Sequence, residues 1–263
     1  MLVAPLAALT GHADPMHGRC VVAHPSGNDL VYAYESGRLV SSEVSAMGAT
    51  LLYAYDAEGR LARIDGTLQG SPAWVQHFTY GDDGRLVSRT MLGAEDGRER
   101  ESWTFSYDAM GRLVGAARQL ADVGERACSL GYDAAGRFET YRCEAANDDV
   151  PDEAGSVSYD EDGRVVMLEK AHGELGSMRQ EFRYAPTGLV TSVVVRDESG
   201  AERMTDDVVH DGQGRVSSIR SRGSDIRLSY EGDFGPGARC GAAPPAPAGF
   251  PALMLIPWFG LSN

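Results

Sequence analysis

One short motif recurs along most of this chain and constrains its fold more than any other feature. Six clear copies read YESGRL, YDAEGRL, YGDDGRL, YDAMGRL, YDAAGRF and YDEDGRV, and they begin at residues 34, 55, 80, 107, 132 and 159. Three weaker copies, YAPTGLV, HDGQGRV and YEGDFG, begin at residues 184, 210 and 230. Successive motif glycines are 21 to 27 residues apart. This regular period indicates a repeat architecture in which each copy builds one supersecondary unit.

Each copy has the chemistry of a hairpin turn. In the fifth copy, Asp133 offers a carboxylate to backbone amides at the first turn position, and Gly136 tolerates positive φ at the last. This order predicts a type I turn followed by a left-handed residue. The repeat turn residues assigned in this way are Tyr55 and Gly59, Tyr80 and Gly84, Tyr107 and Gly111, Tyr132 and Gly136, and Tyr159 and Gly163.

The residues on either side of each turn alternate as they do in β-strands. Trp103, Phe105 and Tyr107 place apolar side chains on one face before a turn. The apolar residue two positions after each glycine then lies opposite the tyrosine as a cross-strand pair. Farther along, apolar positions such as Ile64 and Leu168 fall five residues after the glycine, and this change of parity predicts a β-bulge. We expect an all-β fold in which antiparallel β-hairpin repeats form a curved sheet, a partial spiral or a small barrel.

Four cysteines test the pairing of strands that the turns and bulges predict. Cys128 lies eight residues before Gly136 and Cys143 lies seven after it, so one bulge brings the two cysteines face to face. A cross-strand disulfide is the favoured interpretation, and two free thiols are the alternative. Cys20 and Cys240 then remain as a second pair that would tie the first strand to the end of the repeats. An even number of cysteines favours an oxidising compartment.

The motif Tyr-Asp-x-x-Gly-Arg-Leu at this period resembles the YD repeats of the RHS and wall-associated protein families. The resemblance covers about residues 30–230 and nine copies. Large members of the family wind their repeats into a hollow β-sheet shell that encloses a toxin, and they carry an Asp-Pro-x-Gly-Leu cleavage sequence. That sequence is not found in this chain. The resemblance therefore implies a short, free-standing member without a toxin domain.

The two ends of the chain indicate where the protein is located. Residues 1–13 contain a short apolar stretch with a small-residue ending and are interpreted as a signal remnant. Residues 14–239 form the expected YD-repeat β domain, and residues 240–263 a Pro/Ala-rich linker with an apolar tail. No apolar run has the length of a membrane-spanning helix. We expect a protein that is secreted, periplasmic or part of the cell envelope.

Charge and the absence of known motifs narrow the class of function. Lys and Arg number 24 and Asp and Glu number 38, a net charge of −14 that disfavours nucleic-acid binding. The sequence has no nucleophile elbow and no phosphate-binding loop, so we expect no enzymatic activity, no catalytic residue, no cofactor and no metal site. The motif tyrosines are expected in the core, and the motif arginines over the sheet beside acidic groups.

Two hypotheses about function are favoured over a third, a hydrolase or metal-dependent enzyme hidden in the sheet, which the inward apolar alternation argues against. In the first, the exported protein is a non-catalytic, protein-binding or immunity-like module of a toxin or cell-surface system. It would recognise a toxin or a surface protein through loops between repeats, such as residues 93–100 and 145–153. In the second, it is a structural or adhesive envelope protein that binds carbohydrate. The second hypothesis predicts aromatic side chains on a solvent-facing stripe.

Overall fold

The computed structural model describes residues 17–121, 124–145, 153–172, 176–234 and 240. The interpreted signal remnant, residues 1–13, and the tail, residues 241–263, lie outside this part of the chain. Within the described residues there are eighteen strands and one short 3₁₀ helix, η1 (Ser45–Met47). The strands are β1 (His17–Ala23), β2 (Leu30–Glu35), β3 (Arg38–Val44), β4 (Ala49–Tyr55), β5 (Leu61–Leu68), β6 (Ser71–Tyr80), β7 (Leu86–Gly93), β8 (Glu99–Tyr107), β9 (Leu113–Leu120), β10 (Gly124–Tyr132), β11 (Phe138–Ala145), β12 (Glu153–Tyr159), β13 (Val165–His172), β14 (Gly176–Tyr184), β15 (Val190–Asp197), β16 (Glu202–His210), β17 (Val216–Ser221) and β18 (Ser224–Asp233).

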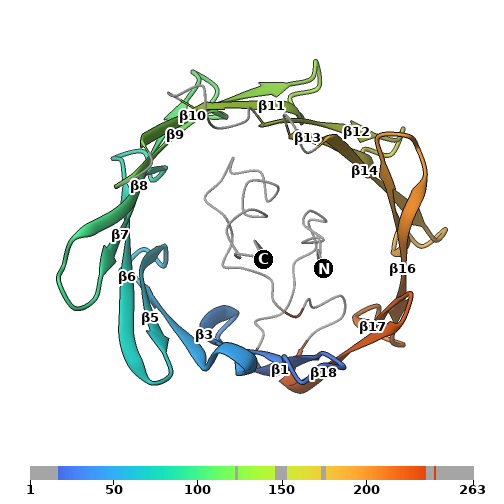
Figure 1. Ribbon diagram of the computed structural model, residues 1–263, viewed down its shortest axis with the longest axis horizontal. Helices are drawn as coiled ribbons and strands as arrows, with labels where there is room; N and C mark the ends of the chain where they lie inside the picture. Colours follow the sequence, from blue (N-terminus) through green and yellow to red (C-terminus); the bar gives the residue numbers. More distant parts are fainter. Residues whose placement is uncertain (1–16, 122–123, 146–152, 173–175, 235–239, 241–263) are drawn as a thin grey trace.

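These strands form one antiparallel sheet that closes on itself. Each strand pairs with its neighbour in sequence. The last strand, β18, pairs with β1 over seven residue pairs, from His17–Asp233 to Ala23–Arg227. Figure 1 shows the resulting ring, viewed along the barrel axis. The prediction of an all-β fold of antiparallel hairpins is confirmed, and of the three forms expected the chain adopts the closed barrel.

Every hairpin that a motif copy builds carries a β-bulge at the same place. In the hairpin of β8 and β9, Tyr107 pairs with Leu113 and Ser106 pairs with Gly115, so Val114 is the extra residue. The same shift in register occurs in the seven equivalent hairpins. The bulge and the cross-strand pair of tyrosine with an apolar residue are therefore confirmed.

The motif glycines adopt the left-handed conformation that their turns require. Gly136 has a φ of 80°, and its amide donates a hydrogen bond to the Asp133 carbonyl oxygen at 2.9 Å. The first motif copy is one residue shorter than the others and differs from the expected turn. There Ser36 (φ 49°) and Gly37 (φ 77°) form a two-residue turn in which both residues have positive φ. The shorter copy thus changes the turn type while its hairpin keeps the bulge.

Because successive strands alternate in direction, their connections lie at two opposite ends of the barrel. The motif end contains the eight repeat turns, at residues 36–37, 56–60, 81–85, 108–112, 133–137, 160–164, 185–189 and 211–215. The loop end contains the other connections, and those described throughout are residues 24–29, 45–48, 69–70, 94–98, 198–201 and 222–223. Of the two loops expected to recognise a partner, residues 93–100 are described, and residues 146–152 of the second lie outside the described part.

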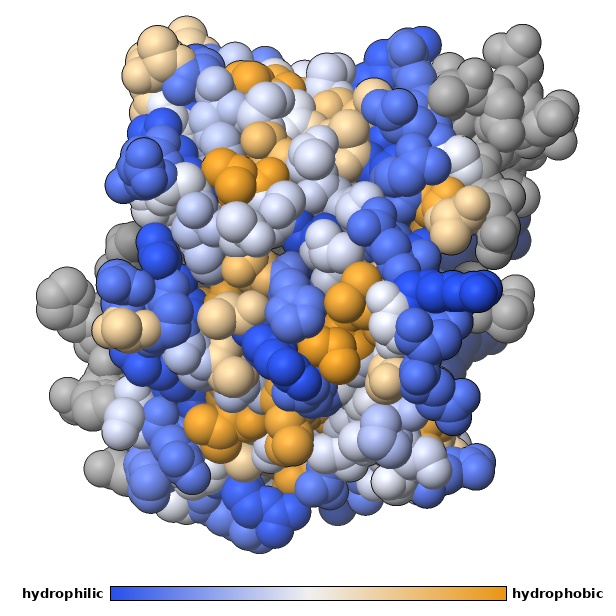
Figure 2. Space-filling model, turned by 90° about the vertical axis from the view of Figure 1, so that its left-hand side faces the viewer, coloured by the Kyte–Doolittle hydropathy of each residue, from blue (hydrophilic) through white to orange (hydrophobic). Residues whose placement is uncertain are grey.

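The two faces of the sheet differ in burial. On β8, Trp103 is 7% exposed and the next residue, Thr104, is exposed, while on β10 buried Cys128 is followed by exposed Ser129. Side chains converge on the concave face of a closed sheet and spread apart on its convex face, so most of the buried set lines the lumen. On β15, Ser192 and Val194 are buried on the opposite face. The register places the aromatic side chains of the described strands in this inner set. Figure 2 shows the outer wall on the side of β5–β8, where apolar patches are interrupted by polar side chains.

The barrel is too wide for its inner side chains to meet across the axis. Barrels of about eight strands are filled by their own side chains, whereas those of about sixteen to eighteen enclose a lumen. The core is therefore a layer along the inner wall, and its clusters contain Trp103 with Leu113, Cys20 with Tyr34, and Val190 with Val193. Among the described residues, no helix is long and apolar enough to cross a membrane.

Candidate functional site

The repeat turns hold their own carboxylate and guanidinium groups in place. In the turn between β10 and β11, the Asp133 carboxylate accepts hydrogen bonds from the amides of Ala135 and Arg137 at 2.9 and 2.8 Å. It also pairs with Arg137 Nε at 2.7 Å. The Arg137 amide, followed by the guanidinium, holds the pKa of Asp133 below its ordinary value. The pairs that repeat this arrangement are Asp56–Arg60, Asp108–Arg112, Asp160–Arg164 and Asp211–Arg215.

Each of these turns is also connected to a neighbouring hairpin. Arg137 lies over the ring of Tyr159, with its guanidinium carbon 4.4 Å from the ring centroid. The Tyr159 hydroxyl donates to the Phe138 carbonyl oxygen at 2.6 Å, so the ring crosses the inner wall toward the preceding hairpin. The motif tyrosines that make this bond, at 2.6 to 2.9 Å, are Tyr55, Tyr80, Tyr107, Tyr132, Tyr159, Tyr184 and Tyr230.

These contacts make the motif a structural joint between hairpins. Burial raises the pKa of Tyr55 to about 12, so its hydroxyl remains a hydrogen-bond donor at neutral pH. The motif arginines lie over tyrosine rings and pair with turn carboxylates, as expected from the sequence. The structure therefore brings the sequence-assigned turn residues together at the motif end, where their polar groups bind one another.

Both cysteine pairs expected from the sequence are disulfides in the structure. Cys128 and Cys143 lie opposite each other on β10 and β11, with Cα atoms 4.0 Å apart. Cys20 on β1 is bonded to Cys240, and their Cα atoms are 5.6 Å apart. The second disulfide joins the strand that closes the barrel to the segment after β18, and its cluster includes Phe234. The two bonds thus stabilise one hairpin and the seam of the barrel.

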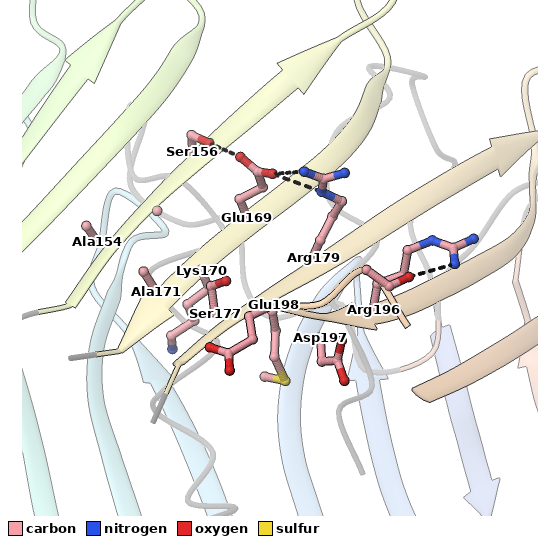
Figure 3. Close-up of a pocket in the computed structure, with 13 residues that line it drawn as sticks. Ala154, Ser156, Glu169, Lys170, Ala171, Ser177, Arg179, Arg196, Asp197 and Glu198 are labelled. Atoms are coloured by element: carbon pink, nitrogen blue, oxygen red, sulfur yellow. Dashed lines mark hydrogen bonds and ion pairs between the residues drawn. The ribbon is translucent and has the colours of Figure 1, made fainter. Parts of the chain in front are cut away.

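A first cavity lies at the loop end, between the loop-end halves of β12 to β15. Its volume is about 440 Å³, and its lining includes Gly155, Lys170, Met178 and Asp197. Figure 3 shows a row of polar contacts beside it, in which Ser156 bonds Glu169 at 3.5 Å and Glu169 pairs with Arg179 at 2.7 Å.

A second cavity of about 350 Å³ also lies at the loop end, beside residues 94–98. Its lining includes Trp74, Met91, Asp96 and Arg100. Arg100 pairs with Asp96 at 2.7 Å, and the Gly93 amide closes the base of the loop by donating to the Arg98 carbonyl oxygen at 2.9 Å. The two cavities both border loop-end connections.

Sequence reasoning missed a charged group on the inner wall of β7 to β13, toward the loop end. We call it the inner charged patch, and it consists of Arg89, Glu101, Arg118, Arg126, Glu153 and Lys170. A signal for it was present in the sequence. Glu101, for example, has the same parity along its strand as Trp103 and Tyr107, so the alternation that predicts inward tyrosines also predicts an inward carboxylate.

The carboxylates of the inner charged patch are buried and strongly bonded. Glu101 pairs with Arg89 and with Arg118, the latter at 3.0 Å. Glu153 pairs with Arg126 at 3.2 Å and with Lys170 at 2.8 Å. Burial lowers the pKa of Arg89 to about 10, which leaves it charged at neutral pH.

The ring of Tyr141 borders the inner charged patch. Its hydroxyl donates to Glu153 at 2.9 Å. Burial, followed by the charge of Glu153, raises the pKa of this tyrosine. Within the part of the chain that the structure describes, no three His, Cys, Asp or Glu side chains are grouped as metal ligands.

Comparison with known proteins gives likenesses of fold only. No protein-family model matches the sequence, and no curated protein matches it. The chain is similar to the Tc holotoxin pore of Photorhabdus luminescens, with a TM-score of 0.35 and 11% identity over 73% of this chain and 13% of that one. It is also similar to a porin-like protein from Bacteroides uniformis, with a TM-score of 0.47 and 14% identity over 83% of this chain and 98% of that one. The chain thus spans only 13% of the length of the toxin chain it resembles.

Proposed function

We propose that this protein is a non-catalytic recognition barrel that binds a protein partner through its loop end. The observation that carries the proposal is the difference between the two ends. At the motif end, repeated contacts use the polar side chains to join neighbouring hairpins. At the loop end, the described connections differ in length and sequence, and they border both cavities. A rigid scaffold that presents dissimilar loops is a common architecture for recognition.

The class of partner follows from the motif. Because the YD motif resembles the repeats of the RHS and wall-associated families, we favour a toxin or a cell-surface protein as the partner. In this role the chain would be an immunity-like or accessory module.

The two disulfides support an oxidising compartment as the place of action. Most bacterial cytosols contain reductants that prevent such disulfides from forming. We therefore favour a secreted, periplasmic or envelope location.

The carbohydrate-binding alternative has less support. A sugar-binding face needs aromatic rings that are open to a ligand. The aromatic side chains of the described strands belong to the inner wall, and large apolar side chains exposed on the outer wall include the aliphatic Leu52 and Val87. The outer wall of the described strands thus lacks the aromatic stripe that an adhesive protein would use.

The proposal is tested by affinity capture of the tagged, oxidised protein from envelope and secreted fractions of its own cells, followed by mass spectrometry. Two loop-end variants are compared with the wild type: one in which Asn-Gly replaces residues 94–97, and one with Glu198→Ala and Ser199→Ala. The matched control is Arg227→Gln, because Arg227 lies on the outer wall and its side chain is 77% exposed.

We expect one stoichiometric protein that the wild type and the Arg227→Gln variant both capture and that at least one loop-end variant loses. If both loop-end variants capture it at the wild-type level, the partner does not bind at the loop end. If the wild type captures no protein, the recognition function itself is contradicted.

A further inference from the structure

The chain returns to the inner wall after its last strand. Phe234 directly follows β18, and its ring contacts the inward rings of Tyr34 and Tyr230, whose centroids are 5.9 and 5.4 Å away. Only 4% of Phe234 is exposed. Cys240 is bonded to Cys20, whose side chain faces inward and is fully buried. Both described residues beyond β18 therefore lie on the inner face, and the chain that follows Cys240 starts from inside the barrel.

The inner wall beside this disulfide is apolar. One step from Cys20 toward the loop end, Val22 lies opposite both Leu30 and Leu228, and inward apolar side chains continue onto β3, β4 and β5. We call this set the apolar arc, and it consists of Val22, Leu30, Val44, Leu51, Ile64 and Leu228. Each of these side chains is half-buried although it faces inward. The strands alone thus leave part of the apolar surface of the arc uncovered.

The apolar arc differs in charge from the rest of the inner wall. The inner charged patch lies on strands from β7 to β13, whereas the inward positions of β18 and of β1 to β5 carry no Asp, Glu, Lys or Arg in the described strands. A charge buried against this arc would have no partner of opposite sign, and burying an unpaired charge is costly. The arc therefore suits an occupant that is both apolar and uncharged.

We propose that the apolar arc binds a segment of this same chain, residues 250–261, which follow the disulfide-bonded Cys240. The segment reads FPALMLIPWFGL. Residues 241–263 contain no Asp, Glu, Lys, Arg or His, although the whole chain has a net charge of −14. The segment thus matches the arc in hydrophobicity and in its lack of charge.

The disulfide brings this segment to the arc. The arc extends over six strands, or about 24 Å at the usual spacing between strands. The ten residues from Cys240 to Phe250 can span up to about 35 Å, so the segment can reach every part of the arc. A short tether also gives an effective concentration in about the millimolar range, which favours the segment over a free apolar ligand or a second copy of the chain. This docking inside the barrel is independent of recognition by the loop-end connections.

The first test is photo-cross-linking within the oxidised, full-length protein, with p-benzoylphenylalanine in place of Trp258. We expect intramolecular cross-links that mass spectrometry maps to β18 and to β1 to β5. As the control, the same photoreactive residue replaces Leu52, which lies on the outer wall and is 51% exposed, and it should not cross-link to residues 250–261. Cross-links from position 258 only to a second copy, to the outer wall or to β7 to β13 would overturn the proposal, as would their absence.

The second test uses two neighbouring leucines of β4. Leu51 belongs to the apolar arc, and Leu52 faces outward. Leu51→Asp should displace the segment and raise the quenching of Trp258 fluorescence by acrylamide about twofold or more, because the new carboxylate has no partner in the arc. Leu52→Asp should leave this quenching unchanged. The signal of Trp258 is the difference between each protein and its Trp258→Phe version.

A variant of the segment itself keeps the wall intact, in case Leu51→Asp unfolds the barrel. The double substitution Leu255→Ser and Ile256→Ser should also raise the quenching of Trp258 about twofold, since it removes apolar contacts with the arc. Ala246→Ser, in the linker, is the matched control and should have no effect. Thermal melts report the folding of each variant. Quenching at the wild-type level in the folded double variant would overturn the proposal.

Partner capture distinguishes this proposal from the recognition function. The variant with Leu255→Ser and Ile256→Ser should capture the loop-end partner as the wild type does, because the loop-end connections are unchanged. Cross-links from position 258 to the arc, in a protein that captures no partner, would support the docking and contradict only the recognition function.

Discussion

The two ends of the barrel connect the same strands in different ways. At the motif end, one set of contacts recurs: an Asp–Arg pair in the turn, the arginine over the tyrosine of the next copy, and the tyrosine hydroxyl on a carbonyl oxygen of the preceding hairpin. At the loop end, Gln69 and Gly70 form a two-residue turn with positive φ at both positions, whereas residues 94–98 form a wider loop. One end is a repeated joint, and the other is a set of individual loops.

This difference shows where the chain tolerates change. A substitution in a motif turn alters contacts with the neighbouring hairpin, while a substitution in a loop-end connection mainly affects its own hairpin. Stability should therefore depend on the motif end, and recognition on the loop end.

The largest loss of stability should follow from opening the seam between β1 and the end of the repeats. Cys20 and Cys240 are 220 residues apart, and Cys128 and Cys143 are 15 apart. A crosslink between distant residues restricts the unfolded chain more, so replacing the first pair by serine should lower the free energy of unfolding by about 5 kcal/mol and replacing the second by about 3 kcal/mol. Urea denaturation without reductant measures both. A greater loss for the shorter loop would contradict this order.

Two glycines with similar backbone conformations allow the loss of stability on substitution to be compared between the two ends. Gly111 at the motif end (φ 80°) and Gly223 at the loop end (φ 84°) have nearly the same backbone conformation. A Cβ on Gly111 would lie 2.1 Å from the Arg85 guanidinium, whereas one on Gly223 would meet nothing within 4 Å. Gly223→Ala should cost about 1 kcal/mol for the left-handed backbone alone. Gly111→Ala should cost about 2 kcal/mol, because it also displaces Arg85 from the ring of Tyr107. Equal losses in urea denaturation would mean that the arginine contact adds no stability.

The hydrogen bonds of the tyrosine hydroxyls should contribute less to the free energy of unfolding than the disulfides and the Gly111 turn. Tyr80 donates to the Leu61 carbonyl oxygen at 2.8 Å and Tyr184 donates to that of Val165 at 2.6 Å. Tyr80→Phe and Tyr184→Phe should each lower the free energy of unfolding by about 1 kcal/mol. Because the two hairpins share no contact of this kind, the losses should add in the double variant to within about 0.5 kcal/mol. Loss of stability in only one variant would show that the copies are not equivalent.

A weaker effect should come from individual turn carboxylates. Backbone and side-chain groups of Arg112 and Arg137 hold the pKa values of Asp108 and Asp133 below their ordinary range. Since the folded-state pKa is the lower one, these carboxylates stabilise the fold above about pH 4, and that contribution is lost as the pH falls through the folded-state pKa. The melting temperature should therefore fall below about pH 4, and the Asp133→Asn variant should show a shallower fall. A variant profile parallel to that of the wild type between pH 2 and 7 would contradict the assignment.

The smallest effect on stability should come from the loop end. Replacing residues 94–97 by Asn-Gly keeps the strands β7 and β8, and it changes a connection that is exposed except for the half-buried Ala94. It removes the pair of Asp96 with Arg100, both of which are exposed to solvent, and such pairs contribute little to stability. We expect a change of less than about 0.5 kcal/mol in the free energy of unfolding. A loss of several kcal/mol would show that this loop holds the barrel and would remove the contrast between the two ends.

The parts of the fold that follow from short-range patterns could be predicted from the sequence. The turn around Asp133 and Gly136, the bulge after each turn and the opposition of Cys128 and Cys143 all depend on residues within one hairpin. The inner charged patch was not predicted, because it joins side chains from six strands, β7 to β10, β12 and β13, whose relative heights depend on several hairpin registers.

The sequence by itself determined an all-β chain of bulged hairpins with inward tyrosines, since turn chemistry and side-chain parity are local properties. Only the tertiary structure decided that the sheet closes. Closure depends on curvature that accumulates over all the strands and on β1, a strand outside the motif repeats, which fits between β18 and β2. The tertiary structure likewise placed Arg118 opposite Arg126, because a connection without the motif sets the register of β9 and β10.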